Sequence, residues 1–229
     1  MKRQSAALLS GILLLGLLAG CEPPTVPSQT SSNAYARLGR FSLQGTAQPG
    51  KLSSSNGNTY LANVPFVKQG ADNTCGQAVA TMLLKYWGHD IDYQTVVNES
   101  NPLNLGTSFD ALQTYLRNKG LHAQGYREGS LELLVELVKR GRPVITLLDF
   151  GGLNWEHYVL VVGYNTRRNT LIFHESNSGP YRELDADSFV TRWGNPSLVG
   201  LPVFGGPSYE RLMFDVGPQA AVASDSADS

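Results

Sequence analysis

Cys75 is the residue whose type and position point most clearly to chemistry. It lies in Asn73-Thr74-Cys75-Gly76-Gln77, where a strongly patterned helix is expected to begin. The dipole and unpaired amides of a helix N-terminus favour a thiolate, the form of cysteine that attacks a carbonyl carbon. Gly76 has no side chain, so a substrate could approach the sulfur closely. A buried structural cysteine gives the same pattern, and catalysis therefore depends on a partner base.

His157 is the best candidate for that base among the four histidines of the chain. It opens the apolar segment HYVLVVGY, which predicts a strand with the imidazole at its edge. The segment between Phe150 and Glu156 predicts a mobile loop bordering a pocket. His89 and His122 lie in polar connections, and His174 ends the next predicted strand.

A thiol hydrolase also needs an oxyanion donor and a group that orients the imidazole. The side-chain amide of Gln69, six residues before Cys75, could supply one donor and the Cys75 backbone amide the other. Gln69 could equally be a solvated polar residue. Glu175 and Asn177 follow the strand after His157, and an antiparallel hairpin would bring both back beside it.

The composition favours neither a metal site nor a nucleic-acid partner. The sequence has no close-spaced ligand pair such as CxxC or HExxH, so no metal or organic cofactor is expected. The chain is 41% hydrophobic and 16% charged with a net charge of −1, and such a balance gives no case for a clustered basic face.

The N-terminus has the layout of an export signal. A positively charged start precedes an apolar run from Ala6 to Leu18, too short for a membrane-spanning helix. The run ends in Leu18-Ala19-Gly20-Cys21, which resembles a bacterial lipobox and implies lipidation at Cys21. The protein is then expected in the cell envelope, outside the cytoplasm and anchored to a bacterial membrane. A plain signal peptide that contains a cysteine, or a single-pass anchor, stays open as an alternative.

Lipidation of Cys21 would leave Cys75 without a disulfide partner, because the chain has only these two cysteines. A single thiol outside the cytoplasm is a liability unless it is buried or used. The cysteine count therefore favours a functional Cys75.

Composition divides the chain into four parts. We predict a signal peptide over 1–20, the lipidated cysteine and a flexible Ser/Thr/Pro-rich tether over 21–57, one folded domain over 58–216, and a disordered acidic tail over 217–229. The oligomeric state stays open.

The domain combines helices with a later run of strands, which predicts an α+β fold. Apolar spacing and caps predict helices over Gly76–Tyr86, Ser108–Lys119, Ser130–Arg140 and Asp185–Trp193. Residues rich in β-branched and aromatic types predict strands over Pro143–Leu148, His157–Tyr164, Thr170–His174 and Arg211–Val216, with a hairpin turn at Asn165–Asn169.

Taken in order, these motifs resemble one family of papain-like cysteine peptidases, the bacteriocin-processing (double-glycine) peptidases and their stand-alone C39-like relatives. The resemblance spans about 60–193 and rests on Gln69, Cys75-Gly76, Tyr86-Trp87-Gly88 and His157-Tyr158-Val159. It implies a papain-like fold in which an N-terminal helical part, with the cysteine helix, packs on an antiparallel sheet that carries the histidine. It also implies that Gln69 is the oxyanion residue, Cys75 the nucleophile and His157 the general base.

The chain departs from the family pattern at two positions. Relatives carry Asp-Pro after the hairpin strand, where the aspartate orients the histidine, and this chain has Glu175-Ser176. The alignment favours Glu175 as the orienting residue, and Asn177 is the alternative. Gln77 stands where relatives often have proline, a change that we expect to be neutral.

The sequence thus predicts an extracytoplasmic, membrane-anchored cysteine peptidase that acts on peptides or proteins. Because the family's leader-processing domains are attached to transporters, a dedicated leader peptidase is less expected here. Two alternatives stay open: a catalytically degenerate peptide-binding lipoprotein, and a thiol amidase or transferase acting on cell-wall peptides.

Overall fold

An eight-stranded antiparallel sheet forms the centre of the protein in the computed structural model, which describes residues 50–150, 156–194 and 211–218. The strands follow the order β1-β2-β5-β4-β8-β3, while β6 pairs with β5, and β7 with β6. Their bounds are β1 Leu52–Ser55, β2 Asn58–Leu61, β3 Leu121–Tyr126, β4 Val144–Asp149, β5 Glu156–Asn165, β6 Thr170–Glu175, β7 Gly179–Asp185 and β8 Met213–Pro218.

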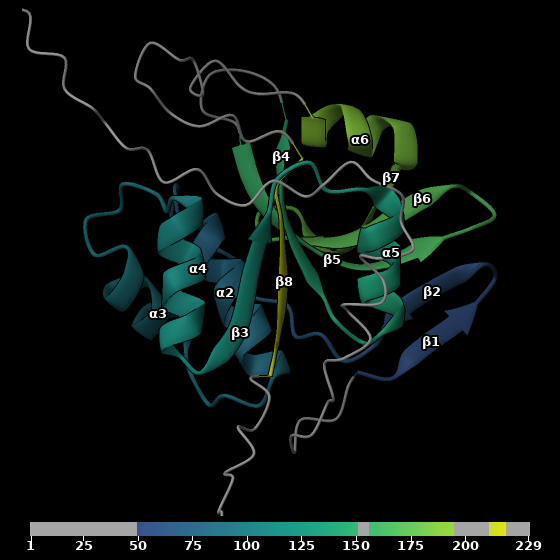
Figure 1. Ribbon diagram of the computed structural model, residues 1–229. Helices are drawn as coiled ribbons and strands as arrows, with labels where there is room; N and C mark the ends of the chain where they lie inside the picture. The colour runs from purple at the N-terminus through teal and green to yellow at the C-terminus, as the bar shows by residue number, and fades with distance from the viewer. Residues whose placement is uncertain (1–49, 151–155, 195–210, 219–229) are drawn as a thin grey trace, which may run out of the picture.

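Helices cover both sides of this sheet (Figure 1). In this view α2, α3 and α4 lie together on one side, and α5 and α6 on the other. Their bounds are α2 Cys75–Tyr86, α3 Tyr93–Ser100, α4 Phe109–Asn118, α5 Leu131–Lys139 and α6 Ala186–Gly194. Within the described ranges, none of these helices has the length and apolar composition that a bilayer crossing requires.

Side-chain caps explain where three of the helices begin. The side chains of Asp92, Ser108 and Ser130 accept hydrogen bonds from backbone amides at the start of α3, α4 and α5. Such caps satisfy N–H groups that have no partner inside the helix. The predicted cap at Ser108 is confirmed.

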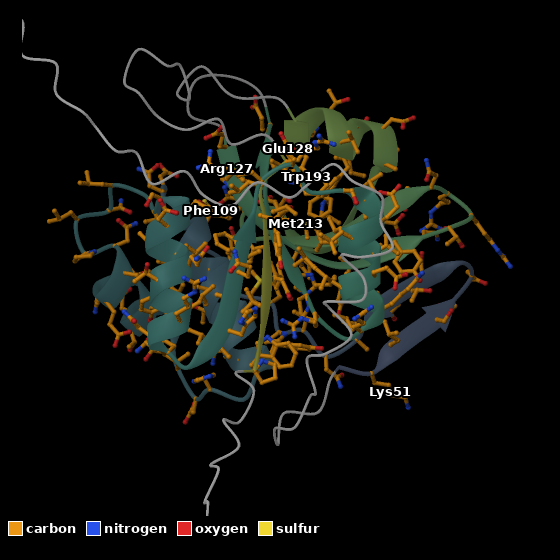
Figure 2. The ribbon with its side chains drawn as sticks, viewed as in Figure 1. Lys51, Phe109, Arg127, Glu128, Trp193 and Met213 are labelled. Atoms are coloured by element: carbon orange, nitrogen blue, oxygen red, sulfur yellow. The ribbon has the colours of Figure 1, made fainter. Side chains whose placement is uncertain are left out.

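The core consists of large apolar side chains between the sheet and its helices (Figure 2). The rings of Phe109 on α4 and Phe214 on β8 stack with centroids 4.0 Å apart. On the other side, Trp193 of α6 is buried and its indole N–H donates to the Leu212 carbonyl at 2.7 Å. These contacts fix the helices on a sheet that carries part of the site described below.

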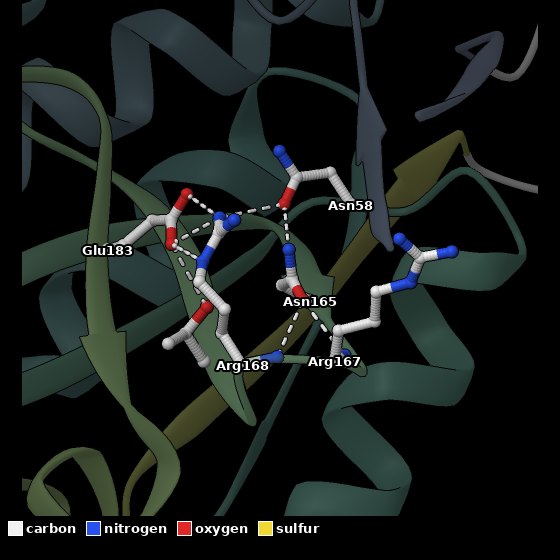
Figure 3. Close-up of polar contacts among 6 residues, drawn as sticks. Asn58, Asn165, Arg167, Arg168 and Glu183 are labelled. Carbon is white, nitrogen blue, oxygen red and sulfur yellow. Dashed lines mark hydrogen bonds and ion pairs between the residues drawn. The ribbon is translucent and has the colours of Figure 1, made fainter. Parts of the chain in front are cut away.

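The β5–β6 turn is held by one side chain, Asn165 (Figure 3). The side-chain oxygen of Asn165 accepts from the backbone amides of Arg167 and Arg168 at 2.9 and 2.8 Å. Its side-chain NH₂ group donates to the side chain of Asn58 on β2. The Arg168 guanidinium in turn pairs with Glu183 on β7. The turn therefore links the β5–β6 hairpin to the next strand, β7, and to β2, which is distant in sequence. The predicted hairpin at Asn165–Asn169 is confirmed.

The predicted α+β class is confirmed, and so are all four predicted helices and all four predicted strands, with ends displaced by one or two residues. The structure adds α3 and strands β1, β2, β3 and β7, which the sequence patterns did not predict. His122, which we placed in a polar connection, lies in β3.

The domain limits need correction at both ends within the described residues. The tether that we predicted over 21–57 includes β1, which pairs with β2 from Leu52 opposite Leu61 to Ser55 opposite Asn58. The serines of β1 read as linker, but an exposed edge strand tolerates them because only its backbone must pair. At the other end β8 runs to Pro218, two residues into the predicted tail. The predictions for 1–49, the loop at 151–155 and 219–229 lie outside the described residues.

Candidate active site

A left-handed turn brings the chain into α2. Asn73 has φ +62°, a conformation that asparagine tolerates better than most residues. The next residue, Thr74, is buried and donates from its hydroxyl to the Ala71 carbonyl. The hydroxyl of Tyr93 on α3 donates to Thr74 Oγ1 at 2.7 Å and accepts from the Gly70 amide at 2.9 Å. The position of Cys75 is therefore fixed by α3 as well as by its own helix.

Cys75 is the first residue of α2, at the start of the predicted helix. The residue as a whole is partly exposed. Burial of the thiol raises its pKa above the ordinary value, and this effect outweighs backbone N–H donation to the sulfur from Tyr158, Gly76 and Cys75 itself. The nearby negative charge of Glu175 also raises this pKa. Backbone amides at the start of the helix lower this pKa, as expected, but desolvation is the larger effect and the net shift is upward.

A Cβ atom at Gly76 would come close to two side chains. It would lie 3.3 Å from Cβ of Thr107, which is tight, and 3.4 Å from the ring of Tyr158, an ordinary contact distance. A larger side chain at this position would therefore press against Thr107. Our expectation that the missing side chain admits a substrate stays a prediction.

His157 is the second residue of β5 and lies opposite Leu148 of β4 in the sheet. Its ring meets the ring of Phe150 edge to face, with centroids 5.9 Å apart. Its Nδ1 atom is buried and has no hydrogen-bond partner among the described residues. The imidazole is thus positioned by packing and strand register.

His174 has a structural role, which leaves His157 as the better base. It is fully buried on β6, and its ring nitrogens contact the Val64 carbonyl and the Tyr181 amide, both at 3.2 Å. Burial lowers the pKa of this imidazole, which favours its neutral form. A neutral ring with both nitrogens occupied cannot accept a proton from a thiol.

Gln69 is buried rather than solvated, with 7% of its surface exposed. Its side-chain oxygen accepts a 2.7 Å hydrogen bond from the hydroxyl of Ser176, and its NH₂ group donates to the Ala71 carbonyl at 3.1 Å. Its backbone amide donates to the Ser176 carbonyl at 3.1 Å. The segment after β6 therefore anchors the residue predicted to stabilise the oxyanion.

Glu175 and Asn177 end up in different places. Glu175 is buried at the end of β6, and its carboxylate accepts from the amides of Asn177 and Ser178 at 2.8 and 2.7 Å. Asn177 is exposed and lines the same cavity as His157. In the β5–β6 pairing Leu160 lies opposite His174, so the residues that follow His174 lie toward the end of β5 that carries His157. Neither side chain is hydrogen-bonded to the imidazole in this structure.

A cavity of about 830 Å³ collects four of the predicted residues. Gln69, Cys75, His157 and Asn177 all line it. Two carboxylate residues, Asp72 and Glu156, also line it. The thiol, the imidazole and the glutamine therefore face one space that could hold a peptide.

One wall of this cavity was not predicted from the sequence. It is formed by residues 105–109, which are the end of the connection between α3 and α4 and the first residue of α4. Gln77, which we expected to be neutral, is fully buried and donates to Ser100 at 3.2 Å and to Thr107. Asn101 is also buried and donates to the Asn73 carbonyl at 3.0 Å. These amides tie the wall to the start of α2. The described residues contain no group of three or more His, Cys, Asp or Glu side chains suited to a metal ion.

Several solved structures of similar fold are described as peptidases or peptidase domains. A protein from Bacillus anthracis, described as a C39-like peptidase, is 18% identical with a TM-score of 0.56, covering 71% of this chain and 98% of that one. A double glycine motif protease from an AMS/PCAT transporter, in complex with its leader peptide, is 20% identical with a TM-score of 0.50 over 74% and 99%. The peptidase domain of Streptococcus ComA is 18% identical, with a TM-score of 0.50 over 69% and 100%.

The fold, with a cysteine helix packed on an antiparallel sheet that carries the histidine, is therefore papain-like. The model of the Peptidase_C39 like family matches residues 61–198. The chain belongs to this family, which points to a cysteine peptidase. No curated protein is similar to the chain in sequence.

Proposed function

We propose that this protein is a membrane-anchored, extracytoplasmic cysteine peptidase with Cys75 as nucleophile, His157 as general base and Gln69 as oxyanion residue. The observation that carries the proposal is the cavity that these three residues line together. The double glycine motif protease of similar fold is known in complex with a leader peptide, which supports a peptide as the substrate class here.

The reaction would begin with proton transfer from the Cys75 thiol to the imidazole of His157. Because burial favours the neutral thiol, the base would act when the substrate is bound rather than maintain a resting thiolate. The sulfur would attack the peptide carbonyl carbon, and the electron pair of the C=O bond would move to oxygen. Donors on Gln69 and the Cys75 backbone would stabilise that oxyanion.

Collapse of this intermediate would break the C–N bond, and the leaving amine would take the proton from His157. Water would then attack the thioester and give its proton to His157. The acyl group would leave as a carboxylic acid, and the returning proton would restore the Cys75 thiol. No other reactant is needed.

The anchor would be the lipid on Cys21, joined to the domain by the chain that precedes β1. The support for this part is the sequence around Cys21. Expressed in a bacterial host, the protein should partition into the detergent phase, and Cys21→Ser should move it to the aqueous phase. Partition of both proteins into the aqueous phase would contradict the anchor without affecting the peptidase proposal.

Hydrolysis of a diverse peptide library tests the enzymatic proposal. Purified residues 50–229 should cleave a subset of the peptides at defined bonds, while Cys75→Ala and His157→Ala should lose this cleavage. Ser188→Ala, a change at a half-buried position of α6 that does not line the cavity, serves as the matched control and should cleave normally. Equal cleavage by Cys75→Ala would remove the thiol from the mechanism.

One observation favours the degenerate peptide-binding alternative: His157 Nδ1 has no partner among the described residues. An unoriented imidazole is a poor base. Under that alternative, the library would be bound but not cleaved by the wild-type protein. Cleavage of cell-wall peptides alone, with other peptides untouched, would indicate the amidase.

A further inference from the structure

Ser176 and Gln69 form a buried clamp behind the cavity. Ser176 is fully buried, and it holds Gln69 at two points: its hydroxyl donates to Gln69 Oε1 at 2.7 Å, and its carbonyl accepts from the Gln69 amide at 3.1 Å. Ser176 is distant from Gln69 in sequence but follows directly on β6. The contact therefore fixes the glutamine relative to the sheet.

Two contacts together fix which end of the Gln69 amide is oxygen and which is nitrogen. The Ala71 carbonyl can only accept, so Nε2 faces it and one of its two N–H groups donates to it at 3.1 Å, while Oε1 faces the Ser176 hydroxyl, which donates to it at 2.7 Å. The second N–H group is left over, and Gln69 lines the cavity. A flipped amide would instead present its oxygen to the developing oxyanion and repel it.

We infer that Ser176 is a positioning residue that keeps the Nε2–H donor of Gln69 directed at the oxyanion. This inference rests on the proposed function and extends it to a residue that does not line the cavity. The resemblance noted in the sequence implies proline at this position, and proline has a carbonyl but no hydroxyl. Of the two contacts with Gln69, only the one from the hydroxyl is therefore particular to Ser176.

Two reagents separate oxyanion stabilisation from thiol reactivity. A peptide aldehyde forms a hemithioacetal: the Cys75 sulfur bonds to the carbonyl carbon, the C=O electron pair moves to oxygen, and the thiol proton reaches that oxygen through His157. This adduct places an oxygen where the oxyanion forms. Iodoacetamide alkylates the same sulfur by displacing iodide and forms no oxyanion. Loss of the oxyanion donor should therefore weaken binding of the aldehyde and leave the rate of alkylation by iodoacetamide unchanged.

The decisive measurement is the dissociation constant of the best of a panel of short peptide aldehydes. Gln69→Ala should raise this dissociation constant by about 100-fold, the usual effect of removing an oxyanion donor. Ser176→Ala should raise it by about 10-fold. Gln69→Glu keeps an acceptor for the Ser176 hydroxyl but has no N–H group, so it should match Gln69→Ala. Iodoacetamide rates should stay within about 2-fold of wild type in the two alanine variants, while the added carboxylate of Gln69→Glu should slow alkylation by disfavouring the thiolate.

A double-mutant cycle distinguishes positioning from a general structural role. Adding Ser176→Ala to Gln69→Ala should weaken the aldehyde no further, because Ser176 acts only through Gln69. Ser178→Ala, two residues on and exposed, is the matched control and should behave as wild type. Thermal unfolding of each variant shows whether the domain stays folded, and the cycle remains interpretable for modest losses of stability.

Three results would overturn the inference. One is an unchanged aldehyde dissociation constant in Ser176→Ala, and another is additive effects in the double mutant. The third is a parallel loss of iodoacetamide reactivity, which would indicate general disruption. Each of these leaves the proposed peptidase intact. A wild-type protein that forms no adduct with any aldehyde of the panel would instead overturn the proposed function, and this inference with it.

Discussion

The carboxylate of Glu175 lies close enough to the thiol of Cys75 for its negative charge to raise the pKa of that thiol, in addition to the larger effect of burial. Glu175 is itself buried at the end of β6, where two backbone amides hold its oxygens. The residue expected to orient the base therefore also acts on the nucleophile. Because this negative charge disfavours the Cys75 thiolate, the thiol should lose its proton only as His157 accepts it.

Glu175→Gln should lower the pKa of Cys75, because it removes this charge and keeps the shape of the side chain. A lower pKa means more thiolate at any pH below it, so alkylation by iodoacetamide should become faster at neutral pH. The pH dependence of the alkylation rate, followed from pH 6 to 10, measures the shift. Glu183→Gln, an exposed change on β7, should leave the profile unchanged. A profile moved to higher pH in Glu175→Gln would contradict the electrostatic assignment.

The same substitution should slow peptide hydrolysis even though it makes the thiol more acidic. A carboxylate can accept more hydrogen bonds than the two from Asn177 and Ser178, so Glu175 retains the capacity to bind His157 Nδ1–H. Loss of an orienting carboxylate costs at least about 10-fold in kcat. Asn177→Ala should have a smaller effect on kcat. A larger loss of kcat in Asn177→Ala than in Glu175→Gln would make Asn177 the orienting residue.

Gln77→Ala should destabilise the domain, because it removes hydrogen bonds from the buried Asn101 and from the half-buried Ser100 and Thr107. An unsatisfied buried polar group costs about 1–3 kcal/mol, and we expect a loss of that size in the free energy of unfolding. Urea denaturation measures it. Gln94→Ala, which breaks one exposed contact with Asn98 on α3, is the matched control and should cost less than about 0.5 kcal/mol. Equal losses of unfolding free energy in Gln77→Ala and Gln94→Ala would mean that the Gln77 amide does not hold the cavity wall at residues 105–109.

Leu105→Ser should raise KM for cleaved peptides with little change in kcat. Leu105 is 81% exposed at the rim of the cavity, and its neighbour Leu103 is 76% exposed. Burying part of such a side chain under a bound peptide contributes on the order of 1 kcal/mol, or about 5-fold in KM. Leu52→Ser, an exposed leucine on β1 away from the cavity, should leave KM unchanged. An unchanged KM in Leu105→Ser would show that the substrate does not cross this rim.

Strongly periodic segments explain why much of the fold was predictable. The helix at Cys75 and the strand at His157 carry clear apolar patterns, and their assembly places both side chains at one cavity. Short polar elements gave no such signal. Strand β1 has the sequence LSSS and α3 has one buried residue, Val96, so only tertiary contacts reveal them.

The details of the site depend on contacts between distant residues, which spacing cannot show. Gln77 looked like a neutral replacement for proline but is a buried donor to residues 100 and 107. Ser176 looked like a simple departure from the family pattern but holds Gln69. The pKa of Cys75 depends on how deeply the folded chain covers the sulfur, because burial outweighs the amides at the helix start that lower this pKa.

Detection of an acyl group on Cys75 during turnover tests the central claim most directly. A cleaved library peptide is mixed with the protein, quenched in acid within milliseconds to seconds, and digested for mass spectrometry. We predict that the fragment containing Cys75 carries the N-terminal part of the substrate as a thioester that hydroxylamine removes, and that Ser and Ala variants of Cys75 lack both adduct and cleavage. Cleavage that proceeds with Cys75 unmodified, or that persists in Cys75→Ala, would contradict the account.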